Sequence, residues 1–194
     1  MDLIVLVTGG VRSGKSSFAE QYVRHHFLSA VYVATAVAFD EEMRQRIQIH
    51  IDQRRDSGFT WKTIEESYEL SNLLEKDLRD EAVILVDCLT VWLSNWLIKL
   101  DVEQSMDSLP LIIDELIKVA QNMNGTIVFV TNEVGSGIVP EYKLGRLFRD
   151  YAGILNRRLA ELADEVIMVV AGIPVPLKQL QYDWKQSRKD GGSA

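Results

Sequence analysis

The sequence predicts a single α/β domain in which helices cover both faces of a mostly parallel β-sheet. The chain of 194 residues is long enough for one domain that buries about 70% of the surface of its unfolded form. Continuous apolar, β-branched runs, which are typical of strands covered on both faces, alternate with helical segments. A glycine-rich loop joins the first run to the first helix, as phosphate-binding loops do. The expected strands span residues 3–8, 31–35, 82–87, 126–131 and 165–171.

The glycine-rich loop has the spacing G-x-x-x-x-G-K-S, which is typical of a P-loop that binds a nucleoside triphosphate. Its backbone N–H groups wrap the polyphosphate, Lys15 lies beside the β and γ phosphates, and the Ser16 hydroxyl is a ligand for Mg²⁺. The helix expected over residues 16–26 adds the positive end of its dipole. The loop residues that we expect to bind nucleotide are Gly9, Gly10, Val11, Arg12, Ser13, Gly14, Lys15 and Ser16.

Polar residues follow three of the expected strands. Asp87 closes residues 82–87, and such an acid either organises Mg²⁺ beside a P-loop or caps a turn. Thr35 and Ala36 end the second strand, where an α/β sheet presents loops to its ligand. Residues 131–140 are either a second ligand-facing loop or a plain turn into the next helix. The candidate metal ligands are therefore Ser16 and Asp87.

Residues 40–54 are predicted to form a helix whose apolar ridge lies next to a ridge that carries Arg46, His50 and Arg54. One interpretation is a boundary histidine on a solvated helix face. The other is a nucleophile that accepts a nucleotidyl or phosphoryl group, with the arginines holding the phosphate that it attacks. Spacing alone does not distinguish them.

Two more helices are predicted from apolar periodicity. Residues 89–100 contain Trp92 and Trp96 four positions apart, which favours packing on one face. Residues 141–163 repeat apolar side chains at three- and four-residue steps, which predicts a long helix against the core. We expect the domain to span residues 1–181 and a polar tail to span residues 182–194.

The composition excludes several classes of protein. The formal net charge of -7 and the lack of basic blocks argue against a nucleic-acid partner. Cys88 is the only cysteine, so the chain has no intramolecular disulfide and no cysteine-based zinc site. No run approaches the roughly 20 apolar residues that span a bilayer. We therefore expect a cytoplasmic protein without a membrane span.

Five segments, in order along the chain, resemble the bifunctional adenosylcobinamide kinase/adenosylcobinamide-phosphate guanylyltransferases of cobalamin biosynthesis. They are residues 9–16, residues 32–36, the set Glu42, Met43, Arg46, Ile47 and His50, residues 86–90, and residues 131–140. The resemblance continues through Leu177 and is more specific in the loop at residues 132–135 and around His50 than in the P-loop. It implies a RecA-like P-loop NTPase fold and a homotrimer.

The resemblance implies two reactions on one corrinoid. In the first, ATP or GTP phosphorylates the aminopropanol hydroxyl of adenosylcobinamide, with Lys15 and Mg²⁺ neutralising charge. In the second, His50 attacks the α-phosphorus of GTP, and the guanylyl-histidine then passes GMP to adenosylcobinamide phosphate, yielding adenosylcobinamide-GDP. The implied catalytic residues are His50 and Lys15. Beyond the P-loop, the implied nucleotide contacts are Ala34, Thr35, Ala36, Ile51, Asp52, Gln53, Arg54, Asp87 and either Glu65 or Glu66, with Arg46 a further candidate for contact with guanine nucleotide.

Other functions also fit a P-loop. One is a kinase for another small metabolite, in which His50 is structural. A second is a nucleotide-dependent switch or assembly ATPase. A third is a family member that retains one of the two activities. The sequence contains no corrinoid motif, and Trp92, Trp96 and residues 131–140 are only candidates for that contact.

Overall fold

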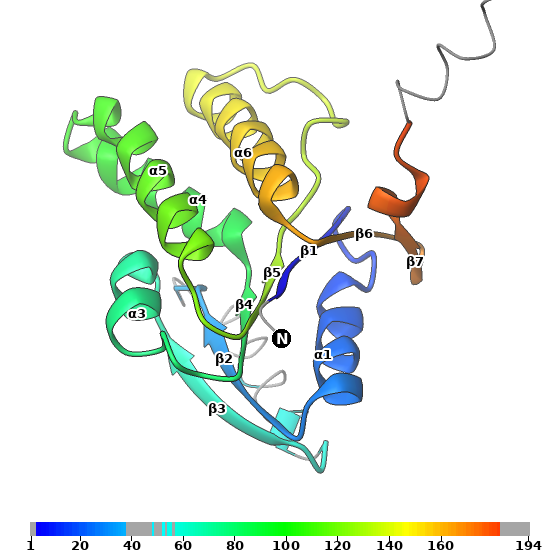
Figure 1. The fold of residues 1–194 in the computed structure, drawn as a ribbon. Coiled ribbons are helices and arrows are strands. Elements are labelled where there is room, and N and C mark those ends of the chain that lie inside the picture. The colour runs from blue at the N-terminus through cyan, green and yellow to red at the C-terminus, as the bar shows by residue number, and fades with distance from the viewer. Residues whose placement is uncertain (1–2, 38–47, 49–51, 53, 56, 183–194) are drawn as a thin grey trace, which may run out of the picture.

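The computed structural model describes residues 3–37, 48, 52, 54, 55 and 57–182. In this part of the chain a seven-stranded sheet with the order β3-β2-β4-β5-β1-β6-β7 forms the centre of the domain (Figure 1). The strands are β1 (Leu3–Gly9), β2 (Ser29–Ala34), β3 (Thr60–Glu65), β4 (Val83–Asp87), β5 (Thr126–Val130), β6 (Glu165–Val170) and β7 (Ile173–Pro176). Only the β6–β7 pair is antiparallel among these, so the predicted mostly parallel sheet is confirmed.

Helices cover both faces of the sheet, as predicted (Figure 1). On one face lies α1 (Lys15–His26). On the other lie α3 (Leu70–Lys76), α4 (Leu89–Val102), α5 (Leu109–Gln121) and α6 (Lys143–Leu162). Two short 3-10 helices span Met106–Ser108 and Leu177–Leu180.

Successive residues of the central strands enter opposite halves of the core. Val5 and Val7 pack on the side of α1, whereas Leu6 packs on the side of α3 to α6. The same alternation places Val128 on the α1 side and Phe129 on the other. Because both faces of these strands are buried, their residues form continuous apolar runs rather than an alternating pattern. Within the described residues no helix is both long and apolar enough to cross a bilayer.

Four elements were absent from the sequence prediction. The strand β3 lies at the sheet edge and is half-exposed, so it lacks the apolar run of the central strands. The strand β7 contains Pro174 and Pro176, which are tolerated at a sheet edge but not in a central strand. The helix α3 has only seven residues. The helix α5 is strongly amphipathic, and its apolar periodicity is the sequence signal that indicates it.

The prediction of a helix over residues 40–54 lies mostly outside the described residues. Helical backbone is described at Gln48, Asp52, Arg54 and Arg55. The predicted helices over residues 16–26, 89–100 and 141–163 are confirmed to within two residues at each end, as α1, α4 and α6.

Two leucines on α5 test how much burial in the core contributes to the free energy of unfolding. Leu116 on α5 is completely buried, whereas Leu111 on the same helix is 68% exposed. Leu116→Ala is expected to lower the free energy of unfolding by about 2–5 kcal/mol, because it removes buried methyl groups and leaves a cavity. Leu111→Ala is the matched control and should change it by less than about 0.5 kcal/mol. Urea denaturation of both variants measures the difference, and equal effects would contradict the assigned burial.

Candidate nucleotide-binding site

The phosphate loop occupies the turn between β1 and α1, as the sequence predicts. Gly9 has no room for a side chain, since a Cβ atom there would lie 2.5 Å from the backbone oxygen of Val169. Gly14 precedes the first residue of α1 and has a φ of 92°, a left-handed conformation that favours glycine. A close backbone approach therefore requires glycine at Gly9, and a positive φ favours glycine at Gly14.

Contacts from its own backbone and from the β6–β7 turn hold the loop in place. The Gly172 N–H donates to the Ser13 carbonyl oxygen at 2.9 Å, and the Lys15 ammonium donates to the Gly10 carbonyl oxygen at 3.3 Å. The Ser13 hydroxyl is buried and has no hydrogen-bond partner within the part of the chain that the structure describes. The lysine is thus held over the loop by one long hydrogen bond, which a phosphate oxygen could replace.

The pairing of residues on neighbouring strands brings the predicted site residues Ala34, Glu65 and Asp87 to the carboxyl-terminal ends of the parallel strands. Val7 pairs with Val130, Val130 with Asp87, Asp87 with Ala34, and Ala34 with Glu65. Strands lie about 4.8 Å apart, so Asp87 on β4 is about 10 Å across the sheet from β1. That spacing suits a carboxylate that reaches a metal through water. Glu65 is four strands from β1, about 19 Å away, and cannot contact nucleotide phosphates that the P-loop binds.

The Asp87 carboxylate is hydrogen-bonded to a buried tyrosine. The Tyr32 hydroxyl donates to Asp87 Oδ2 at 3.0 Å, and Tyr32 is 5% exposed. Burial raises the pKa of Tyr32 well above its usual value, and the negative charge of Asp87 raises it further. The phenol therefore stays protonated and acts as the donor. Sequence reasoning gave Tyr32 no role, although a tyrosine inside an apolar strand was a signal of a buried polar partner.

Thr35 and Cys88 connect the ends of β2 and β4. The Thr35 hydroxyl donates to the Cys88 carbonyl oxygen at 2.7 Å and accepts from the Cys88 N–H at 2.9 Å. Thr35 is completely buried, so its side chain is engaged by the protein itself. Burial, helped by the negative charge of Asp87 and partly opposed by Lys15, raises the pKa of the Cys88 thiol to about 11. Both charges act on Cys88 because the P-loop lies next to the end of β4.

Arg54, which the sequence predicts to bind nucleotide, is buried against Tyr32. Its guanidinium carbon lies 3.6 Å from the centre of the Tyr32 ring, and its Nη1 atom lies 3.5 Å from the Glu20 carboxylate. Only 3% of the residue is exposed, and among the described residues its Nε and Nη1 groups have no hydrogen-bond partner. A buried cation whose N–H groups make no hydrogen bond can accept an anion at little further desolvation cost, even beside the ion pair with Glu20.

The loop that follows β5 lies beside the P-loop. The Glu133 N–H donates to the Gly9 carbonyl oxygen at 3.0 Å, and the Asn132 N–H donates to the Thr90 hydroxyl at 2.6 Å. Asn156 on α6 donates to the Asn132 carbonyl oxygen at 3.0 Å and accepts from the Thr131 hydroxyl at 2.7 Å. These anchors were not found in the sequence, because Thr90 and Asn156 are distant in the chain and nothing in their local sequence indicates that they meet the loop after β5.

Three of the predicted site residues, His50, Ile51 and Gln53, lie outside the described residues. Asp52 is described, and its carboxylate accepts from the Gln48 amide at 3.0 Å and pairs with Arg55 at 3.3 Å. The roles of His50, Ile51, Asp52 and Gln53 stay predictions.

Trp92, a candidate for corrinoid contact, is completely buried and donates from its ring nitrogen to the Tyr68 carbonyl oxygen at 2.9 Å. It packs in the core and is not available to a substrate.

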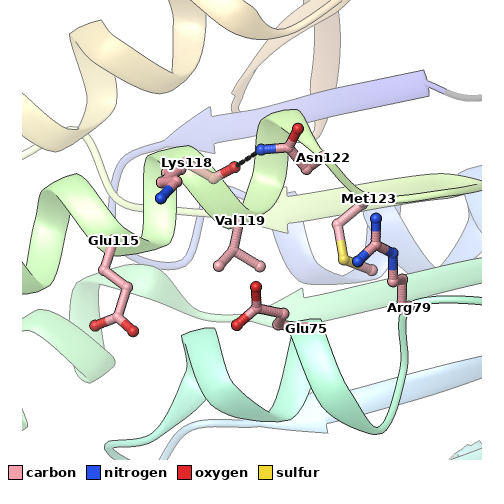
Figure 2. A pocket seen from close by; sticks show the side chains of 7 residues that line it. All are labelled: Glu75, Arg79, Glu115, Lys118, Val119, Asn122 and Met123. Atoms are coloured by element: carbon pink, nitrogen blue, oxygen red, sulfur yellow. Dashed lines mark hydrogen bonds between the residues drawn. The ribbon is translucent and has the colours of Figure 1, made fainter.

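A separate pocket of about 120 Å³ opens between α3 and α5 (Figure 2). Its lining residues are Glu75, Arg79, Glu115, Lys118, Val119, Asn122 and Met123. The C-terminal ends of α3 and α5 lead into the first residues of β4 and β5, so this pocket lies at the opposite edge of the sheet from the P-loop. It is not part of the nucleotide site.

The residues at the P-loop fit a nucleotide-bound Mg²⁺. The described residues contain no group of three or more His, Cys, Asp or Glu side chains that could hold a metal ion without other ligands. Mg²⁺ keeps several waters and usually binds through one or two protein groups together with substrate phosphates. Ser16 in the first turn of α1 and Asp87 on β4 match that type of site.

The fold and this edge define a P-loop nucleotide-binding protein. One solved structure, from a structural and biochemical analysis of a prototypical ATPase of the type III secretion system of pathogenic bacteria, aligns with a TM-score of 0.54 at 11% identity. The alignment covers 96% of this chain and 60% of the ATPase, and it establishes the RecA-like P-loop fold alone.

Residues 5–177 match the family model of cobinamide kinase/cobinamide phosphate guanyltransferase, and the chain belongs to this family of enzymes. The bifunctional adenosylcobalamin biosynthesis protein CobU of Salmonella typhimurium is 42% identical over 185 residues, covering 91% of this chain and 100% of the relative. CobU of Escherichia coli K12 is 38% identical with the same coverage. CobP of Pseudomonas aeruginosa is 39% identical, covering 89% of this chain and 96% of the relative. The resemblance inferred from the motifs is confirmed.

The close approach at Gly9 predicts different effects for neighbouring glycines. Gly9→Ala is expected to lower the free energy of unfolding by about 1–3 kcal/mol, because the new methyl group would clash with the backbone of β6. A Cβ atom at Gly10 would have no neighbour within 4 Å, so Gly10→Ala should cost less than about 0.5 kcal/mol. Denaturant unfolding of the nucleotide-free protein compares them, and an unchanged stability for Gly9→Ala would refute the packing.

The raised pKa of Cys88 predicts slow alkylation at neutral pH. A shift from the ordinary value of 9.0 to about 11 lowers the thiolate fraction at pH 8 by about 100-fold. The rate with iodoacetamide should therefore rise about tenfold per pH unit through pH 10 without levelling. The urea-unfolded protein is the reference, and its rate should level near pH 9. A native profile that also levels near pH 9 would disprove the shift.

Proposed function

We propose that this chain phosphorylates adenosylcobinamide with ATP or GTP and then transfers GMP from GTP to the product, by way of a guanylyl-histidine at His50. The observation that carries the proposal is a complete P-loop that follows β1, two strands from Asp87, in a chain of the cobinamide kinase/cobinamide phosphate guanyltransferase family. The homotrimer, the cytoplasmic location and the division at residues 181 and 182 are further proposals that rest on the sequence.

In the kinase step, the P-loop amides and the N-terminus of α1 would hold the nucleotide phosphates. Lys15 would leave the Gly10 carbonyl oxygen and bind the β and γ phosphate oxygens, where negative charge accumulates during transfer. Ser16 and, through water, Asp87 would hold Mg²⁺, which supplies charge neutralisation at the phosphates. The substrate hydroxyl attacks the γ-phosphorus, and the nucleoside diphosphate leaves.

In the guanylyl step, a ring nitrogen of His50 attacks the α-phosphorus of GTP, and the bond to pyrophosphate breaks. The phosphate of adenosylcobinamide phosphate then attacks the same phosphorus and releases His50, which completes adenosylcobinamide-GDP. Splitting one displacement into two lowers each barrier. Arg54 supports this step, because it is four residues from His50 and its buried Nε and Nη1 atoms have no hydrogen-bond partner among the described residues. Those groups suit a phosphate oxygen of GTP.

Labelled GTP distinguishes the guanylyl step from the kinase step. The protein with Mg²⁺ and α-labelled GTP is expected to retain label after denaturation, whereas γ-labelled GTP should leave none. The bond should be lost in acid and stable in base, as for a phosphorus–nitrogen bond to histidine. His50→Ala should abolish the label.

His26→Ala is the matched control, since the His26 ring nitrogen hydrogen-bonds the Tyr22 carbonyl oxygen near the end of α1, away from the P-loop. It should label like the unmodified protein. Absence of label under conditions where GTP binds would leave only the kinase half. Label that survives in His50→Ala would move the nucleophile elsewhere.

A further inference from the structure

Tyr32 on β2 contacts two charged groups that the proposed function uses. Its hydroxyl donates to Asp87 Oδ2 at 3.0 Å, and its ring lies 3.6 Å below the guanidinium carbon of Arg54. Trp61 on β3 packs edge-on against the same ring, with centroids 5.9 Å apart and planes at 89°. The hydrogen bond to Asp87, the guanidinium of Arg54 and the ring of Trp61 together hold the Tyr32 side chain in place.

We propose that Tyr32 is a positioning residue of the phosphoryl-transfer site, which orients the Asp87 carboxylate toward the metal that accompanies the nucleotide. This inference rests on the proposed function, because it takes Asp87 to be the metal-organising acid. Tyr32 itself touches neither nucleotide nor metal in this role.

Asp87 depends on such a partner. Among the described residues, Tyr32 is the only side chain that hydrogen-bonds the Asp87 carboxylate. The carboxylate is half-exposed at the end of β4 and can otherwise rotate about two side-chain bonds. With Oδ2 held by Tyr32, the plane of the carboxylate is set and Oδ1 is left for water on the metal. Groups that hydrogen-bond a metal-organising carboxylate typically change metal affinity when they are removed.

The ring contacts make the hydroxyl position reproducible. Tyr32 lies two residues before Ala34, which is in register with Asp87 on the neighbouring strand. The phenol therefore extends along the sheet to the carboxylate, while Arg54 and Trp61 prevent the ring from turning away. A phenylalanine keeps the ring and both of these contacts and lacks only the hydroxyl.

The experiment measures Mn²⁺ binding by electron paramagnetic resonance in the presence of a non-hydrolysable GTP analogue. Tyr32→Phe is expected to weaken Mn²⁺ binding about 10- to 100-fold, the effect typical of removing a group that hydrogen-bonds a metal-organising carboxylate. Its affinity for the analogue in EDTA should stay within about twofold of the unmodified protein. Unchanged Mn²⁺ affinity in Tyr32→Phe would overturn the inference.

Tyr22→Phe is the matched control, because Tyr22 also hydrogen-bonds a carboxylate, Glu165, in the same half of the core. Glu165 begins β6, at the opposite edge of the sheet from the P-loop. Tyr22→Phe should leave Mn²⁺ binding unchanged. A loss of Mn²⁺ affinity equal to that of Tyr32→Phe would mean that a general loss of stability explains both, and would overturn the inference.

Asp87→Asn separates this inference from the proposed function. If Asp87→Asn weakens Mn²⁺ binding and Tyr32→Phe has no further effect in its presence, Tyr32 acts through Asp87. If Asp87→Asn weakens binding and the two substitutions add independently, the positioning role is wrong while the metal assignment stands. If Asp87→Asn leaves Mn²⁺ binding unchanged, the metal assignment in the proposed function is wrong and the inference is wrong with it.

Discussion

The parallel register of the central strands is the constraint on which the site depends. Because β1, β5, β4 and β2 run in one direction, the row from Val7 through Val130 and Asp87 to Ala34 places their following loops at one edge. A slip of one residue would turn each strand over, moving Val7 from the α1 side of the core to the other. The burial of both faces thus holds the register, and the register sets the distance between the P-loop and Asp87.

The site edge combines a rigid frame with a small number of groups left free for ligand. Thr35, Thr131 and Asn156 bond to backbone or to each other, which fixes the loops after β2, β4 and β5. By contrast, the Ser13 hydroxyl and the Nε and Nη1 groups of Arg54 are buried and find no hydrogen-bond partner in residues 3–37, 48, 52, 54, 55 and 57–182. Unpaired buried polar groups are costly in a stable fold and are therefore expected where a ligand completes them.

Fold and family carry different weight in the assignment of function. The likeness to a secretion ATPase at 11% identity shows how the strands and helices are arranged, and the same arrangement serves many chemistries. The match over residues 5–177 identifies the family. The long distance between Glu65 and β1 adds a physical point, because Glu65 cannot contact phosphates that the P-loop binds.

The sequence by itself determined the P-loop, the mostly parallel sheet, the helices on both faces and the family. These depend on local spacing, on apolar runs and on motifs that are read within short segments. Tertiary structure alone decided that Tyr32 bonds Asp87, that Arg54 lies on the Tyr32 ring and that Thr90 and Asn156 anchor the loop after β5. It also decided the edge strands β3 and β7. Such contacts join residues far apart in the chain, and no local pattern encodes which strands become neighbours.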